Sequence, residues 1–133
     1  MKTAKFFTAI LLSLTFVLAS CSKYEEGPAI SLLTKKMRLT GDWTPVKSIT
    51  DGVSVEYDNK DRIITFEKDG TYISKLSSVS FTGEWDFNDD KTKVVISNSG
   101  SIQFNNEKEI IRLTNKELWL IDAGVETHYE KLK

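Results

Sequence analysis

Cysteine and histidine are almost absent from this sequence, since its 133 residues contain one of each. A single cysteine has no partner in the chain for a disulfide, and metal sites built from histidine or cysteine need several such ligands. Basic residues are not in excess either, because 18 Lys and Arg stand against 19 Asp and Glu. Nucleic-acid binding requires a basic surface, so we expect no nucleic-acid partner.

Motifs of arranged catalytic or metal-binding residues are lacking as well. His128 is not accompanied by a nucleophile motif such as G-x-S-x-G, so we expect a surface or packed imidazole. The acidic clusters 58–61 and 88–90 lack the D-x-[DN]-x-[DN]-G spacing of a calcium loop, and Asn and Asp favour turns at such places. The sequence therefore predicts no enzyme, no metal and no cofactor.

The long apolar run near the start of the chain is too short to cross a membrane. It covers residues 6–18 and follows two lysines, Lys2 and Lys5. A spanning helix needs about 20 apolar residues, whereas a short run behind positive charges is typical of a signal peptide. We therefore expect residues 1–20 to form a signal peptide.

The single cysteine follows this run directly. The quartet Leu18-Ala19-Ser20-Cys21 resembles the lipobox of bacterial lipoproteins. The resemblance implies cleavage before Cys21, a diacylglyceryl thioether on its sulfur and acylation of the new amino terminus, and several acyl chains together give a lasting anchor. The alternative is a buried free thiol, but Cys21 lies outside any folded pattern. We expect Cys21 to be the lipidation site and the membrane attachment.

Residues 21–28 are polar and charged and end in Gly27-Pro28, which is typical of a tether. Ser22 is not the aspartate that resembles an inner-membrane retention signal, so we expect an outer-membrane lipoprotein on the periplasmic or cell-surface face. Lys23 followed by acidic residues looks like the surface-export signal of some Gram-negative lipoproteins, although a solvated linker explains the segment equally well.

The rest of the chain, 29–133, has the length of one domain with a modest core. Ile30, Leu33 and Met37 lie at helical spacing and predict a short helix over 29–39, ending before Gly41. Short alternating segments separated by turn residues follow. The predicted strands are 43–49, 53–57, 62–66, 71–76, 80–87, 92–97, 101–104, 109–113, 117–121 and 125–132.

Closure of these strands into a barrel is expected because no further helix crosses over between them. Without crossovers the strands pair antiparallel, and closure buries the apolar face of such a meander while it removes the exposed edges. The sequence therefore predicts an all-β fold, a small up-and-down antiparallel barrel of about eight strands with a short N-terminal helix.

The triplet Gly41-Asp42-Trp43, after the helix, resembles the Gly-x-Trp signature of lipocalins. The segments LTGDW, ITFEKDGTY, FTGEW, IIRLTNKELWL and YEKLK are similar to those of lipocalin-like domains in bacterial lipoproteins, over about 39–133. The resemblance implies that Trp43 closes the barrel floor under a basic side chain from the last strand, for which Lys131 is the candidate. Gly83-Glu84-Trp85 repeats the motif and is either a second structural corner or a faint internal repeat. Gly41, Trp43 and Trp85 are therefore expected to be structural.

Lipocalins usually have longer loops at the open end of the barrel, often a disulfide, and a helix after the last strand. The sequence shows none of these features, so the resemblance implies the fold but not ligand binding. The aromatic residues expected on the inner face are Trp43, Phe66, Phe81, Trp85, Phe87 and Phe104, with Tyr72 as a further candidate. An eight-stranded barrel is wide enough either to be filled by side chains or to hold one small ligand, and this many rings favours filling. The weak candidates for ligand contact are Phe66, Tyr72, Phe81 and Phe104.

Trp119 alternates with Leu118 and Leu120, so either the tryptophan or the leucine pair faces outward, and an exposed tryptophan would indicate a partner surface. The expected function is a monomeric, membrane-anchored binding module for a small apolar ligand or an envelope protein. The alternative is a filled barrel that serves as a structural or interaction subunit of an envelope complex. A cavity favours the first function, and a packed interior with an outer apolar patch favours the second.

Overall fold

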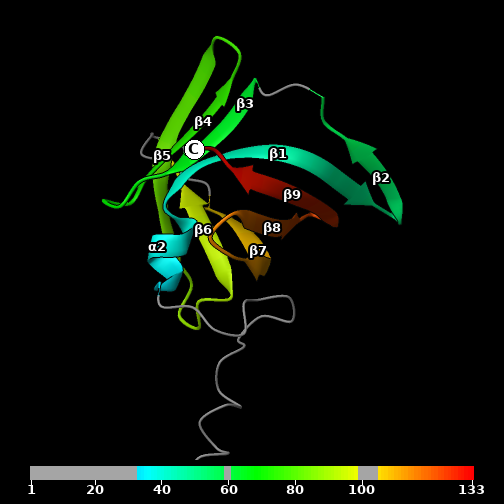
Figure 1. The fold of residues 1–133 in the computed structure, drawn as a ribbon. Helices are drawn as coiled ribbons and strands as arrows, with labels where there is room; N and C mark the ends of the chain where they lie inside the picture. Colours follow the sequence, from blue (N-terminus) through cyan, green and yellow to red (C-terminus); the bar gives the residue numbers. More distant parts are fainter. Residues whose placement is uncertain (1–32, 59–60, 99–104) are drawn as a thin grey trace, which may run out of the picture.

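The computed structural model describes residues 33–58, 61–98 and 105–133. The predicted signal peptide, Cys21, the tether and the predicted strand 101–104 with Phe104 lie outside these residues. The described part contains one short helix, α2 (Lys35–Leu39), and a single antiparallel sheet (Figure 1). Its strands are β1 (Gly41–Thr50), β2 (Val53–Glu56), β3 (Arg62–Phe66), β4 (Thr71–Leu76), β5 (Val79–Phe87), β6 (Lys93–Ser97), β7 (Asn105–Leu113), β8 (Glu117–Asp122) and β9 (Val125–Lys131).

The sheet closes on itself because β1 pairs along its length with the last strand, β9. The other edge of β1 is shared by two strands: Trp43 pairs with Ile64 of β3, whereas Lys47 pairs with Glu56 of β2. The strands β1 and β3 to β9 therefore form a closed eight-stranded barrel, and β2 extends the sheet beside the far half of β1. The predicted all-β, up-and-down antiparallel barrel is confirmed.

The predicted helix is confirmed only in part, because the helix of the described residues covers Lys35–Leu39 alone. Within the described residues the helix begins at Lys35, where the side chain of Thr34 caps it, and Met37 is 48% exposed. Leu39 is fully buried instead. The helix has only five residues and is held to the barrel by its C-terminal end, so a spacing counted from Ile30 does not determine its orientation.

One end of the barrel interior is filled by the hydrophobic core. The fully or almost fully buried side chains there include Trp43, Phe66, Trp85, Val94, Leu113 and Leu118. The rings of Phe66 and Trp85 meet edge to face at 5.5 Å between centroids, a favourable geometry for aromatic pairs. In Figure 1 the helix α2 lies at this closed end, and the tip of the β4–β5 hairpin points away from it.

Two irregularities change which side chains face inward along the strands. The register shifts between Pro45 and Lys47 in β1 and between Ile110 and Arg112 in β7. An extra residue in one strand reverses the alternation of side chains beyond it. Lys47 and Arg112 consequently lie on the outer face, in register with His128 and Trp119 respectively.

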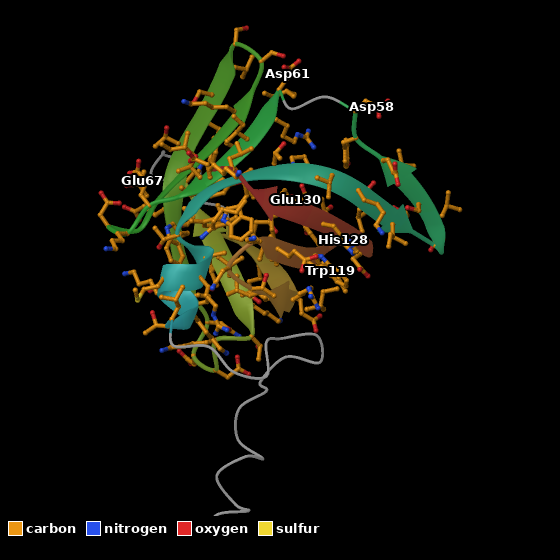
Figure 2. The ribbon with its side chains drawn as sticks, viewed as in Figure 1. Asp58, Asp61, Glu67, Trp119, His128 and Glu130 are labelled. Atoms are coloured by element: carbon orange, nitrogen blue, oxygen red, sulfur yellow. The ribbon has the colours of Figure 1, made fainter. Side chains whose placement is uncertain are left out.

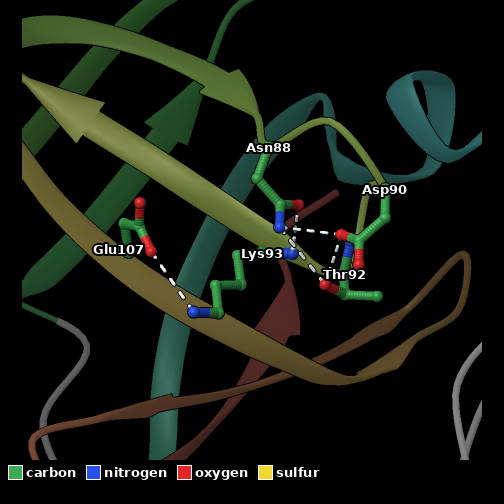
Figure 3. A network of polar contacts seen from close by, with 5 residues as sticks. All are labelled: Asn88, Asp90, Thr92, Lys93 and Glu107. Carbon is green, nitrogen blue, oxygen red and sulfur yellow. Dashed lines mark hydrogen bonds and ion pairs between the residues drawn. The ribbon is translucent and has the colours of Figure 1, made fainter.

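The acidic segment after β5 forms a turn through its own side chains (Figure 3). The Asp90 carboxylate accepts hydrogen bonds from the side-chain amide of Asn88 at 2.7 Å and from the Thr92 hydroxyl at 2.6 Å. The side-chain oxygen Oδ1 of Asn88 accepts from the Lys93 backbone N–H at 2.8 Å. The Lys93 side chain reaches Glu107 on β7. Side-chain bonds to nearby backbone are the reason that Asn and Asp favour turns, and a turn was predicted here.

Candidate functional site: the open half of the barrel

The floor of the barrel is built around Trp43, which is fully buried. Its indole N–H donates to the Leu39 carbonyl at 2.8 Å and so ties β1 to the end of α2. The Lys131 Nζ lies 4.8 Å from the centroid of the indole and donates to two backbone carbonyls of the helix end, those of Arg38 and Thr40. Burial lowers the pKa of Lys131. Gly41 has φ +133°, and a Cβ there would lie 3.2 Å from Lys131 Cε.

Trp85, on β5, closes the same end of the barrel from the strands opposite β1. Its indole N–H donates to the Glu67 carbonyl at 2.9 Å, and Lys36 Nζ lies 5.8 Å from its ring centroid. Gly83, two residues earlier on the inner face, allows β5 to approach β6 closely, since a Cβ there would lie 2.4 Å from the Ser97 carbonyl oxygen. The second Gly-x-Trp segment therefore forms a corner of the barrel.

The open half of the barrel contains a hollow of about 290 Å³. Its lining residues come from every strand from β3 to β9, so the hollow lies inside the ring. The polar and aromatic part of the lining consists of Arg62, Tyr72, Ser74, Phe81, Lys108 and Tyr129. The expectation that rings fill the interior is therefore correct for the closed half and wrong for the open half.

The candidates for ligand contact divide between these two halves. Tyr72 and Phe81 line the hollow, with their ring centroids 6.4 Å apart. Phe66 does not line it, because the ring is fully buried in the core at the closed end. Phe104 lies outside the described residues.

Sequence reasoning missed the polar part of the lining, namely Arg62, Lys108 and Tyr129. The alternation of β3 could have indicated that Arg62 faces inward, because Arg62 lies two and four residues before the buried Ile64 and Phe66. The signal for Lys108 was hidden, since the strand was predicted to begin at 109, whereas β7 begins at Asn105.

An ion pair lies at the mouth of the hollow, between neighbouring strands. The Lys108 ammonium donates to Asp122 Oδ2, and the Asn106 amide donates to the same oxygen at 3.3 Å. The hydrogen bond from Lys108 holds the pKa of Asp122 below its usual range. The charges of Lys108 and Asp122 thus neutralise each other.

The outer face of β7, β8 and β9 carries a stacked row that settles the orientation of Trp119. Leu118 and Leu120 are buried, so Trp119 faces outward, where Figure 2 shows it beside His128. The two rings are parallel within 3°, with centroids 3.8 Å apart, and Arg112 Cζ lies 5.0 Å from the indole centroid.

Polar contacts surround this row, so it is not a bare apolar patch. Arg112 donates to Glu117 at 2.9 and 3.0 Å, and Nε2 of His128 bonds to Glu126. His128 is a packed imidazole, buried between its neighbours. Because the Arg112 guanidinium and the His128 ring lie against Trp119, the indole offers little free face to a partner.

No helix within the described ranges is both long and apolar enough to cross a membrane. In the same part of the chain, His, Cys, Asp and Glu side chains nowhere gather in a group of three or more that could hold a metal ion.

Comparison with known proteins supports the fold. No protein-family model matches the sequence, and no curated protein matches it. A lipocalin-like protein from Bacteroides uniformis has a similar structure, with 16% identity, a TM-score of 0.58, and coverage of 71% of this chain and 99% of that one. An uncharacterized protein from Bacteroides eggerthii is similar to the same extent, with 15% identity, a TM-score of 0.58 and the same coverage. The chain therefore has a lipocalin-like fold.

Proposed function

We propose that this protein binds a small, mainly apolar molecule in the open half of its barrel. The observation that carries the proposal is the hollow of about 290 Å³, whose apolar residues at the mouth are uncovered. Leu76, Val79 and Phe81 belong to its lining and are exposed, Val79 by 70%. A ligand that covers them removes apolar surface from water, which stabilises a complex by about 25 cal/mol per Å².

The size of the hollow limits the ligand. Pockets for small molecules usually measure about 300–1,000 Å³, so a hollow of about 290 Å³ suits a ligand at the small end of that range. The packed core of Phe66, Trp85 and Trp43 below it prevents deeper entry. The alternative of a filled barrel with an outer partner surface is disfavoured, since the interior is hollow and Trp119 is covered on the outer face.

Membrane attachment through Cys21 is the second part of the proposal, and the lipobox Leu18-Ala19-Ser20-Cys21 supports it. The chain enters the barrel at α2, at the closed end, so an anchor upstream of α2 leaves the mouth free (Figure 1). In cells that make the chain, Cys21→Ser should abolish labelling with palmitate and move the protein out of the membrane fraction. A labelled, membrane-bound variant would contradict the attachment.

Octanol, an uncharged molecule with a short apolar chain, tests the binding proposal. Isothermal titration calorimetry on the full chain, refolded without detergent, should show saturable binding of one octanol. Ser74→Phe places a ring in the hollow and should abolish this binding. Ser80→Phe adds the same ring at an exposed position one strand away, opposite Lys75, and should leave binding unchanged. Absence of octanol binding, or equal binding by the two variants, would contradict the proposal.

A further inference from the structure

Among the residues that the structure describes, one positive charge in the hollow is not neutralised. Three charged side chains of these residues lie on the inner face at the open end: Arg62, Lys108 and Asp122. Lys108 is paired with Asp122. Within the described ranges Arg62 makes no ion pair, and its guanidinium is the remaining cation at the mouth. A guanidinium presents a planar set of N–H donors that matches a carboxylate with two parallel hydrogen bonds.

Two tyrosines share the lining of the hollow with this guanidinium. Tyr72 and Tyr129 come from strands β4 and β9; Tyr72 is buried, and Tyr129 is partly buried against the core. Burial raises the pKa of Tyr72, and burial together with the neighbouring Tyr72 raises the pKa of Tyr129 to about 12. The charge of Arg62 lowers the pKa of both phenols, but by less than burial raises it. Both hydroxyls therefore keep their protons at neutral pH and remain hydrogen-bond donors.

The apolar part of the lining adjoins Arg62 at the mouth, because Leu76 of β4 pairs directly with Arg62 of β3. The exposed side chains Leu76, Val79 and Phe81 belong to the β4–β5 hairpin and face the hollow. The hollow thus combines hydrogen-bond donors with an exposed apolar surface next to them. An uncharged apolar ligand would match the apolar surface but would remove water from Arg62 without replacing its hydrogen bonds, which is unfavourable.

We propose that the ligand of the hollow is an amphipathic organic monoanion. Its carboxylate is held by Arg62 with the hydroxyls of Tyr72 and Tyr129, and its apolar part covers the β4–β5 hairpin. The inference rests on the proposed function, because it names the ligand class for the same hollow. Arg62 is then the residue that determines specificity for an anion, and Tyr72 and Tyr129 add donors that an ester or alcohol cannot fully use.

Octanoate and octanol separate the charge from the apolar chain, and titration calorimetry on the full chain compares them. Hydrogen bonds to charged groups are strong enough that octanoate should bind at least about tenfold more tightly than octanol. Arg62→Gln should remove this difference by weakening octanoate about tenfold, while octanol binding stays unchanged. Arg62→Lys keeps the charge and should keep part of the preference. The matched control is Lys75→Gln, which removes an outward-facing charge from the adjacent strand.

The outcomes distinguish the inference from the proposed function. Equal binding of octanoate and octanol by the unmodified chain would overturn the inference and leave the proposed function standing, as would an unchanged preference in Arg62→Gln. Failure of both compounds to bind would overturn the proposed function and the inference with it. Arg62 is exposed, so Arg62→Gln should fold normally, and its thermal melt checks this.

Discussion

Replacement of Trp43 by alanine tests the physical account of the closed end. The indole is fully buried, and truncation of a buried aromatic side chain typically costs about 3–5 kcal/mol. The change also leaves the Leu39 carbonyl without its hydrogen bond and removes the ring beneath Lys131. Small domains unfold with about 5–15 kcal/mol, so Trp43→Ala should remove a large part of the free energy of unfolding.

Urea unfolding followed by far-UV circular dichroism measures this loss without depending on tryptophan emission. With a urea dependence of about 1–3 kcal/mol/M, a loss of about 4 kcal/mol lowers the midpoint by roughly 1–4 M. Trp43→Phe keeps a ring in the core and loses the indole N–H bond, which is worth about 0.5–1.5 kcal/mol. Its midpoint should therefore lie between those of the unmodified chain and of Trp43→Ala.

The matched control is Trp119→Ala, which removes the same side chain from the outer face of the barrel. Trp119 is partly exposed and mainly stacks on His128, and aromatic pairs contribute about 0.5–1.5 kcal/mol beyond their buried area. The control should cost clearly less than Trp43→Ala. A Trp43→Ala midpoint close to that of the unmodified chain, or an equal loss in the control, would refute the role of Trp43 in closing the barrel.

Two further predictions concern the corner at β5 and the tyrosine in the hollow. Gly83→Ala places a Cβ 2.4 Å from the Ser97 carbonyl oxygen and should destabilise the protein by about 1–3 kcal/mol in urea melts; an unchanged midpoint would show that the two strands separate freely. Tyr129 has its folded-state pKa raised from 10 to about 12, so its contribution to stability is complete below pH 10 and is lost as the pH rises towards 12. Tyr129→Phe should therefore lose stability less steeply over that interval in alkaline melts, and an equally steep loss would contradict the burial of this phenol.

Much of the fold could be predicted because its signals are local. Turn residues separate the strands, apolar residues alternate along them, and the absence of crossover helices leaves antiparallel pairing as the outcome. The segment after β5 was predicted as a turn and forms one, since Asn88 and Asp90 bond to their own neighbours. The resemblance to lipocalins likewise depended on local motifs, with Trp43 directly after a short helix.

The orientation of several side chains could not be predicted, because it depends on irregularities that alternation does not reveal. The shift between Ile110 and Arg112 places Arg112 outside, against Trp119. The same local pattern left Trp119 and His128 open to either face, and the stacking of their rings is a contact between two strands. Met37 shares a helical spacing with Ile30 and Leu33, yet it is exposed, whereas Leu39 is the residue of the helix that is fully buried.

The sequence by itself determined the strand pattern, the closed antiparallel barrel and the position of Cys21 ahead of it, since these follow from composition and spacing along the chain. Only the tertiary structure decided that the interior is packed at one end and hollow at the other. Whether facing side chains meet depends on the diameter and register of the closed sheet, to which every strand contributes. For the same reason Arg62, Tyr72 and Tyr129, from three different strands, line one hollow only in the closed barrel.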